Sequence, residues 1–340
     1  MKRKLLILLT TLGSLHAMLF LAGFISPYDP RDQNRDYPFV PPTHIHFLDA
    51  RGNLHLHPFV YQWVSDPSLF RGYRESRERE YPIRFFVLGN TYRIGFFSFR
   101  THLIGVDSPA QLFLAGTDNF GRDQFSRVLY GGRISIAAGL LATGISLSLA
   151  LFLGTAAGFY GRWIDETLMR IAELFLVLPW LYLLFAVRAF LPLHISPAAA
   201  FLLLVIVIGA IGWARPARLV RGIVLSAKSR RYVVASRSFG ASDAYVLRRH
   251  VLPHTYGVLL TQATLLIPQY IVAEVTLSFF GLGLREPEPS WGNLLATLRQ
   301  YDVLTSYWWM FSPALALVVF SLGYLLLANA LHQQLQSTST

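Results

Sequence analysis

The sequence predicts an all-α, polytopic membrane protein with six spanning helices and a β-containing insert after the first helix. Only 14% of the 340 residues are charged, whereas a soluble domain carries about 25%. Hydrophobic residues make up 53% of the chain and gather in long uncharged runs. The basic residues, which give a formal net charge of +11, cluster in the connections between these runs, as is typical of membrane proteins. We therefore expect membrane lipids, and no nucleic acid, as partners.

Six runs have the length of a spanning helix, which needs about 20 mostly apolar residues to cross a hydrocarbon core about 30 Å thick. They are Leu5–Ile25, Ile134–Gly161, Ile171–Leu191, Pro197–Ala214, Thr255–Leu284 and Trp308–Leu331. The first run follows a basic start and could also be a signal peptide. Its apolar stretch exceeds the usual length of about 7–15 residues and no small-residue cleavage site ends it, which favours an uncleaved signal anchor.

The orientation follows from residues 215–254, which we call the basic loop. Its arginines and lysines face a single acid, Asp243, whereas the connection 192–196 contains neither arginine nor lysine. Basic connections stay in the cytoplasm, so the basic loop is expected there. With six spans, the N-terminus and the tail 333–340 are then cytoplasmic as well.

Residues 26–132 are expected on the outer side, because long loops cross the membrane whatever their charge. This stretch is too long for an unstructured connection, and it contains short alternating runs separated by turn residues. His44–Leu48 with Leu54–Phe59, and Ile83–Leu88 with Thr91–Phe97, are predicted as two β-hairpins. We interpret the stretch as a small β-containing periplasmic insert.

Two features of the insert have a weaker pattern. The mixed-charge run Phe70–Tyr81 is expected to form a solvated helix or loop. His44 and His46, like His55 and His57, are two residues apart and share strand faces. If the strands pair, four imidazoles could converge on a metal. The pattern is more typical of exposed strand histidines, so no metal site is predicted.

The basic loop has the pattern of two short helices joined by glycine. Arg231–Phe239 is predicted as a helix that ends at Gly240, the residue that most easily enters the left-handed region. Ser242 is a plausible N-cap for a second helix, Asp243–Val251, and Pro253 is expected to close that element before the fifth span. A projecting pair with exposed Tyr232 and Phe239 would suit docking into a groove. On spacing alone, an ordinary cytoplasmic loop explains the pattern equally well.

A family resemblance distinguishes these interpretations. Tyr232–Asp243, followed by Arg249–Pro253, resembles the EAA loop of bacterial ABC importer permeases. Gly116–Asp123 and Leu277–Gly283 resemble segments of the C-type subunit of the oligopeptide/dipeptide permeases within that family. The match runs in order over about residues 112–331.

The resemblance implies the type I ABC importer permease fold in the bacterial inner membrane. The apolar runs predict an N-terminal transmembrane helix over 1–25 and a five-helix core over 133–332 that carries the basic loop. It implies a non-catalytic subunit for peptides or related small solutes, without a cofactor. It also implies a homologous B-type permease chain, two cytoplasmic ATPase subunits and a periplasmic or lipid-anchored solute-binding protein as partners. In the family, the loop's short helix inserts into a cleft of the ATPase. The residues expected to couple to the ATPase are Tyr232, Val234, Ala235, Ser236, Phe239, Gly240, Ala241, Asp243, Leu252 and Pro253.

The sequence departs from the family pattern at two places. Val234 stands where the EAA motif has its first acid, which removes one polar contact to the ATPase. The insert is also longer than the family leads us to expect. The resemblance therefore does not extend to the residues before about 110.

The chain lacks the motif for an ATP site of its own. A P-loop needs a lysine directly after a glycine, because the lysine and backbone amides cradle the phosphates. The only lysines are Lys2, Lys4 and Lys228, and none follows a glycine. Work driven by ATP must therefore come from separate subunits.

Three residues within the spans are candidates for the translocation path or for bundle packing. Glu274 lies in the fifth run, where a buried acid is costly and marks either a functional site or a structural ion pair or hydrogen bond. Pro179 and Pro268 are expected inside spans three and five, where proline kinks a helix. Kinks suit gating, but proline is also common in spanning helices.

Several alternatives remain open at this stage. The same motifs would fit an importer for nickel, glutathione, a sugar conjugate or another small solute. A membrane-embedded enzyme is disfavoured, because the six runs contain no aspartate and only Glu173 and Glu274 as acids. A secondary transporter is disfavoured because no inverted repeat or duplicated half is found.

Overall fold

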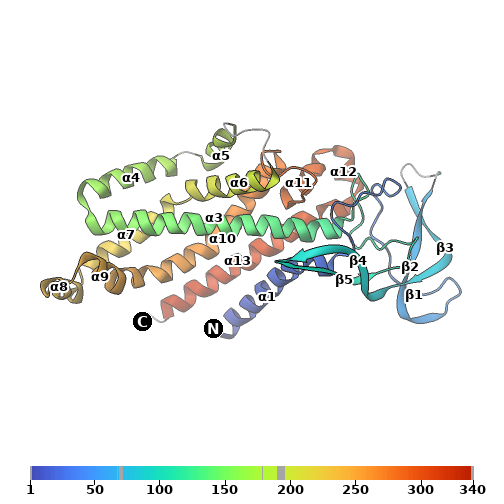
Figure 1. Ribbon diagram of the computed structural model, residues 1–340, viewed down its shortest axis with the longest axis horizontal. Helices are drawn as coiled ribbons and strands as arrows, with labels where there is room; N and C mark the ends of the chain where they lie inside the picture. The colour runs from blue at the N-terminus through green and yellow to red at the C-terminus, as the bar shows by residue number, and fades with distance from the viewer. Residues whose placement is uncertain (1, 67, 69–71, 178, 190–195, 338–340) are drawn as a thin grey trace. The chain divides into compact units, whose positions relative to one another are not determined.

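The computed structural model describes the chain except residues 1, 67, 69–71, 178, 190–195 and 338–340. The chain divides into two compact units (Figure 1). The first comprises Met1–Leu12, Ile136–Leu277 and Phe320–Thr340, and the second comprises Gly13–Ser135 and Ser278–Val319. The long helices α1, α3, α10 and α13 contribute residues to both units.

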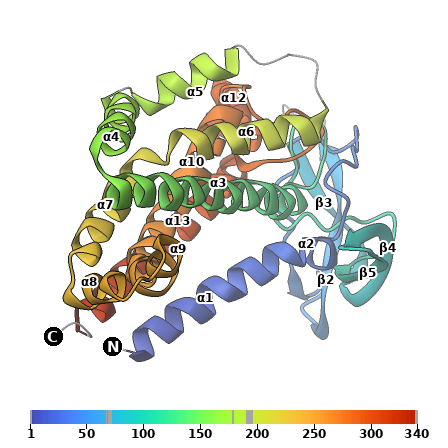
Figure 2. The ribbon, with the colours of Figure 1, turned by 60° about the vertical axis from the view of Figure 1, so that its left-hand side comes forward.

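The first unit is helical. Its elements are α1 (Lys2–Phe20), α3 (Gln124–Tyr160), α4 (Arg162–Val177), α5 (Trp180–Ala189), α6 (Pro197–Ile211), α7 (Ala214–Lys228), α8 (Arg231–Ser238), α9 (Asp243–Val246), a π-helix (Leu247–Val251), a 3₁₀ turn (Leu252–Thr255), α10 (Tyr256–Phe279) and α13 (Ser312–Ser337). Figure 2 shows α3, α6 and α10 side by side. The backbones of α3 and α6 approach closely, because a Cβ on Gly209 would lie only 2.8 Å from the carbonyl oxygen of Ala142. Small residues permit such close packing between spanning helices.

The second unit combines strands with short helices. Its elements are α2 (Ala22–Ile25), β1 (His46–Leu48), β2 (Leu54–Asp66), β3 (Gly72–Pro82), β4 (Arg84–Ile94), β5 (Phe97–Gly105), α11 (Trp291–Ala296), 3₁₀ turns at Thr297–Arg299 and Trp308–Phe311, and α12 (Tyr301–Ser306). The strands form an antiparallel sheet of order β1-β2-β3 and a separate β4-β5 pair. Aromatic and aliphatic side chains from the sheet and the flanking segments form its cores, among them Val60, Trp63, Leu112 and Phe113.

Within the described residues, four helices are long and apolar enough to cross a membrane. They cover Arg3–Phe20, Gln124–Tyr160, Asp243–Phe279 and Trp308–Leu331. The pair α6 and α7, bent by 45°, would make a fifth span. The predicted third span, Ile171–Leu191, is divided between α4 and α5. The expected number of six spans therefore stays a prediction.

Several predicted boundaries are wrong. α3 begins at Gln124 rather than Ile134. Pro179 lies between α4 and α5, outside any helix. Pro253 does not close its element, because helical structure continues from Asp243 to Phe279; it occupies the first turn of the 3₁₀ segment, where its missing N–H costs little. The tail 333–340, for which no secondary structure was predicted, is helical as far as Ser337.

Parts of several predictions lie outside the described residues. They are residue 1 of the N-terminal helix, residues 70 and 71 of the mixed-charge run, residues 178, 190 and 191 of the third span, residues 192–195 of the connection between spans three and four, and residues 338–340 of the tail.

The strand predictions have mixed outcomes. β1 pairs with β2 as the alternating pattern predicts for the first hairpin, with Leu48 opposite Leu54. The second hairpin is wrong, because Arg84–Ile94 is one strand that runs through Gly89 and Asn90 and pairs with β5. The prediction of a helix or loop over Phe70–Tyr81 is also wrong. The described part of this run belongs to β3, which is hydrogen-bonded to β2 despite its charged sequence.

Candidate functional site

The basic loop folds as the two short helices expected from its sequence. α8 ends at Ser238, and Gly240 has a φ of +82°, which confirms the predicted left-handed turn. Ser242 caps the next helix, since its hydroxyl accepts a hydrogen bond of 3.3 Å from the backbone N–H of Tyr245. The first turn after Asp243 is α-helical and continues as the π-helix.

One face of the loop packs inward. The buried side chains of Val233, Val246 and Val251 join Val220 and Val224 of α7 in one apolar cluster. The loop is therefore fixed to α7 by apolar contacts rather than suspended from its ends. Val233 is fully buried, whereas Phe239 of the same segment is exposed.

The opposite face is exposed. Phe239 is 92% exposed, Val234 is 54% exposed and Tyr232 is 43% exposed. The Tyr232 hydroxyl lies 2.7 Å from the Nε2 atom of His254, which connects α8 to the 3₁₀ turn that follows the π-helix. The loop thus presents an apolar side chain, Phe239, directly before the turn at Gly240.

The remaining residues expected to couple to the ATPase lie around this exposed face. Ala235, Asp243 and Pro253 are exposed, and Ser236, Ala241 and Leu252 are half-buried. None of these side chains supplies an arrangement for chemistry on a substrate, which fits a docking element rather than an active site.

Charged side chains fix the base of the loop. The Lys228 ammonium donates to the carbonyl oxygen of Gly158 at 2.7 Å and so satisfies a group at the C-terminus of α3, where cations are favoured. Arg221 on α7 forms a bidentate ion pair with Asp165 on α4, with one N–O distance of 2.6 Å. The Arg237 guanidinium lies 4.8 Å from the centre of the Phe159 ring and 3.3 Å from the Asp243 carboxylate.

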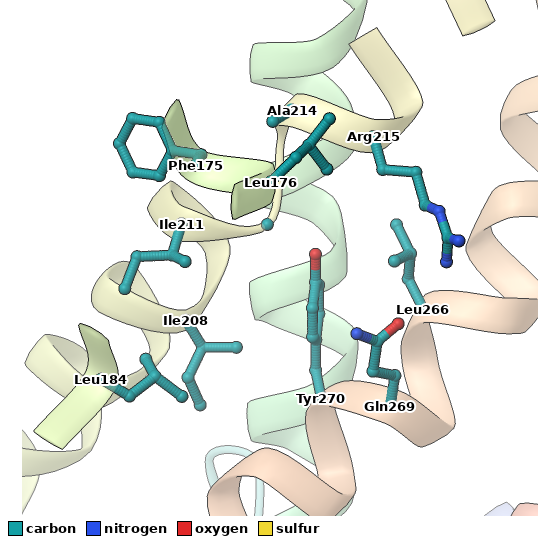
Figure 3. Close-up of a pocket in the computed structure, with 11 residues that line it drawn as sticks. Phe175, Leu176, Leu184, Ile208, Ile211, Ala214, Arg215, Leu266, Gln269 and Tyr270 are labelled. Carbon is teal, nitrogen blue, oxygen red and sulfur yellow. The ribbon is translucent and has the colours of Figure 1, made fainter. Parts of the chain in front are cut away.

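A pocket of about 270 Å³ lies within the helices of the first unit, next to the bend between α6 and α7 (Figure 3). Its apolar wall includes Phe175, Ile208 and Leu266. Three polar side chains from α7 and α10 also line it: Arg215, Gln269 and Tyr270. The Tyr270 hydroxyl donates a hydrogen bond of 2.9 Å to Ser146 on α3. The sequence analysis missed these residues, although Gln269 and Tyr270 are polar positions inside an apolar run and could have been singled out.

Glu274 is fully buried on α10, and Pro268 lies inside the same helix. Neither residue lines the pocket beside Tyr270, nor does Pro179. The burial of Glu274 is what we expect of a polar side chain that faces the other helices of a bundle rather than lipid. Whether Glu274 acts in packing or along a path stays a prediction.

The segment Gly116–Asp123 of the second unit is a buried ion network. The Asp118 carboxylate accepts from Arg122 Nε at 2.7 Å, and the Arg122 and Arg127 side chains donate to Glu286 at 2.6 Å and 2.8 Å. Asp123 caps α3 by accepting from the Ser126 N–H at 2.8 Å, and burial raises the pKa of its carboxyl to about 7. These ion pairs therefore connect the segment 116–127 to the segment around Glu286.

The four strand histidines do not converge on one point. His44 and His46 lie beside Glu75, whereas His55 lies beside Asp49 and Glu80. Among the residues that the structure describes, His57 belongs to neither group. The two carboxylate partners on β3 could not be expected from a sequence interpretation that placed this run in a helix or loop.

The chain is similar to membrane components of known transport systems. The family model for the binding-protein-dependent transport system inner membrane component matches residues 150–337. The dipeptide transport system permease protein of Bacillus subtilis (strain 168) is 36% identical over 65% of this chain and 67% of its own length. The oligopeptide transport system permease protein of the same organism is 34% identical over 69% of this chain and 75% of its own length. The glutathione transport system permease protein of Pectobacterium atrosepticum is 33% identical over 67% of this chain and 74% of its own length.

Solved structures give a more distant likeness. An amino acid ABC transporter with histidines covers 61% of this chain and 94% of its own, with a TM-score of 0.46 at 16% identity. The MetNI methionine ABC transporter in an inward-facing conformation covers 62% of this chain and 95% of its own, with a TM-score of 0.43 at 19% identity. Similarity at this level carries no further argument.

Proposed function

Because this chain belongs to the family of binding-protein-dependent transport system inner membrane components, we propose that it is the C-type permease subunit of a bacterial ABC importer for peptides or a related small solute. Family membership makes it a non-catalytic membrane subunit that works with an ATPase and a solute-binding protein, and it supports the type I importer permease fold. The B-type permease chain and the pair of ATPase subunits are part of the proposal.

The substrate proposal is supported by the names of the relatives. Permease proteins of dipeptide and oligopeptide transport systems match two thirds of the chain. The glutathione permease protein matches nearly as well, which keeps glutathione, itself a small peptide, as the alternative substrate. Nickel or another small solute would use the same motifs.

The proposed topology has six spans, with the insert 26–132 outside and both termini in the cytoplasm. It is supported by the density of basic residues in the basic loop and by the apolar helices described above. The chain has no cysteine, so single cysteines can be introduced at the exposed Ser238 of the basic loop and the exposed Ser98 of the insert. Ser238→Cys should react only with membrane-permeant reagents and Ser98→Cys with impermeant ones. The reverse labelling pattern would refute the topology.

The observation that carries the coupling proposal is the division of the basic loop into a buried face and an exposed face. Val233, Val246 and Val251 anchor the loop to α7, while Phe239 is 92% exposed. An aromatic side chain beside a fixed turn is the kind of residue that fills a pocket on a partner and dominates an interface. We infer that the exposed face binds the ATPase and that the buried face transmits the movement of the ATPase to α7.

Substitution of Gly240 tests this role. A Cβ at Gly240 would meet no atom within 4 Å, but its φ of +82° disfavours any side chain, at a cost of about 1–2 kcal/mol. Gly240→Val should leave the chain inserted in the membrane, while solute uptake falls and less ATPase co-purifies.

Gly222→Ala is the matched control for this substitution. A Cβ at Gly222 also meets no atom within 4 Å, but Gly222 has an ordinary helical backbone within α7. If uptake by Gly240→Val equals that of Gly222→Ala, the basic loop is not the coupling element.

A further inference from the structure

Two imidazoles and one carboxylate meet on one face of the β1-β2-β3 sheet. The Nδ1 atom of His44 lies 3.0 Å from Glu75 Oε1, and the Nε2 atom of His46 lies 3.1 Å from Glu75 Oε2. One ligand atom from each of the three side chains lies within 4.8 Å of the other two. Such a set of donors has the composition of a transition-metal site.

The strand register explains why these residues meet. Glu75 on β3 is opposite Trp63 on the central strand β2, and directly opposite residues project from the same face of a sheet. His46 is the first residue of β1, which flanks the other edge of β2, and His44 lies two residues before it. The imidazole of His44 lies 5.9 Å from the Trp63 ring, and that of His46 lies 5.0 Å from the Tyr61 ring. The side chains from β1 and β3 therefore meet over the aromatic residues of β2.

The Glu75 carboxylate is shielded from solvent and contacts both imidazoles. The Glu75 side chain is only 10% exposed, and its ion-pair partners in the described part of the chain are the two histidines. Because a buried carboxylate is costly without a cationic partner, a bound divalent cation would stabilise the arrangement.

We propose that His44, His46 and Glu75 bind a zinc ion. Zinc takes histidine nitrogen and carboxylate oxygen at about 2.0–2.2 Å in a tetrahedral arrangement, which separates neighbouring ligand atoms by about 3.4 Å. The distances of 3.0–3.3 Å between the imidazole nitrogens and the Glu75 oxygens come close to this spacing. Three protein ligands leave the fourth position open for water or for a donor from another molecule.

The second cluster, Asp49, His55 and Glu80, does not offer the same site. The Asp49 carboxylate already accepts from the backbone N–H groups of Asn53 and Arg51 and from the Asn53 side chain. These hydrogen bonds hold the pKa of the Asp49 carboxyl below its usual value, and the one from the Asn53 backbone N–H has the largest effect. His55 lies 3.7 Å from Glu80. Asp49 is therefore engaged in its own turn, and we expect one tight site per chain.

The ion would connect the two outer strands of the sheet. β1 has only three residues, His46–Leu48, and pairs with β2 alone. A metal bound by His44 and His46 on one side and Glu75 on the other would fix the start of β1 to β3. Ligand binding to the folded state alone raises stability by mass action, so zinc should stabilise the chain against unfolding.

The experiment uses the full chain purified in detergent through an affinity tag without histidine. Zinc is titrated against a chromophoric chelator, and Co²⁺ is used as a spectroscopic probe of tetrahedral coordination. Wild type should bind one equivalent of Zn²⁺ tightly and unfold at a higher temperature with it. His44→Ala should weaken binding by more than the roughly 10–100-fold that loss of an outer-shell partner costs and remove the thermal shift. Glu75→Gln should do the same.

His57→Ala is the matched control, because His57, like His44, is an exposed histidine of the insert but lies outside the cluster. It should retain wild-type affinity, the cobalt spectrum and the thermal shift. The His44 side chain is 68% exposed, so its replacement should not disturb folding even if Glu75→Gln does. Equal zinc affinity in wild type and His44→Ala would mean adventitious binding by other histidines, and absence of binding to wild type would mean a hydrogen-bonded cluster only. Either result would overturn the proposal.

Discussion

Two segments that resemble the same permease family differ in what their residues do. In Gly116–Asp123 the charged side chains are buried, and Asp118 and Arg122, each 2% exposed, form an ion pair. In the basic loop the side chains around the turn are exposed, and Phe239 is 92% exposed. A residue pattern shared with a family can therefore serve the fold in one place and an interface in another. Burial distinguishes the two cases.

Removal of Asp118 should have the largest effect. Asp118→Ala leaves the buried guanidinium groups of Arg122 and Arg127 with one acid, Glu286, which is 43% exposed. Loss of one partner of a buried ion pair costs about 3–5 kcal/mol, so the unfolding temperature and the amount of protein in membranes should both fall.

Asp243→Ala in the basic loop is the contrasting control. Its ion pair with Arg237, at 3.3 Å, is exposed, and such pairs contribute about 0–1 kcal/mol. Similar thermal shifts for Asp118→Ala and Asp243→Ala would remove the distinction between the two segments.

Two truncations within the basic loop should separate stability from coupling. Val233 is fully buried, so Val233→Ala should cost about 1–2 kcal/mol through lost apolar burial. Phe239→Ala should change stability by less than about 0.5 kcal/mol but weaken ATPase binding by at least about 1 kcal/mol. Thermal unfolding and ATPase co-purification measured on the same preparations would test both. If Phe239→Ala destabilises the chain as much as Val233→Ala, the exposed face has a structural role.

A separate effect on stability is the pH dependence that arises from Asp123. Burial raises the pKa of its carboxyl to about 7, whereas in the unfolded chain it loses its proton near pH 4. Between these values the folded state binds the additional proton, so the unfolding free energy falls as the pH rises from about 4 to 7. Asp123→Asn keeps an N-cap for α3 and removes the titration.

The advantage of the Asp123→Asn variant in unfolding temperature over wild type should therefore grow with pH across this window. Parallel pH profiles for the two proteins would show that Asp123 does not titrate as its burial predicts.

The sequence was most informative where a local rule acts alone. Gly240 and Ser242 follow from turn and capping preferences of a few neighbouring residues, and both have the predicted conformations. The first hairpin has a clear apolar alternation around a turn. By contrast, β3 has a charged sequence with no apolar face, and its strand structure depends on hydrogen bonds to β2, which lies elsewhere in the sequence. Pro179 illustrates the same limit, because the sequence predicted it as a kink inside one span, whereas in the structure it lies between two helices.

The sequence by itself determined that the chain contains long apolar helices, that it has no P-loop, and which loop resembles a coupling element, because these properties depend on composition and on the order of neighbouring residues. Only the tertiary structure decided that Val233 faces inward while Phe239 faces outward, that the charged residues of 116–123 form a buried network, and that Glu75 joins two histidines. Each of these depends on which distant segments pack against one another. Contacts between distant segments result from the summed burial and hydrogen bonding of the whole unit, and no local pattern records them.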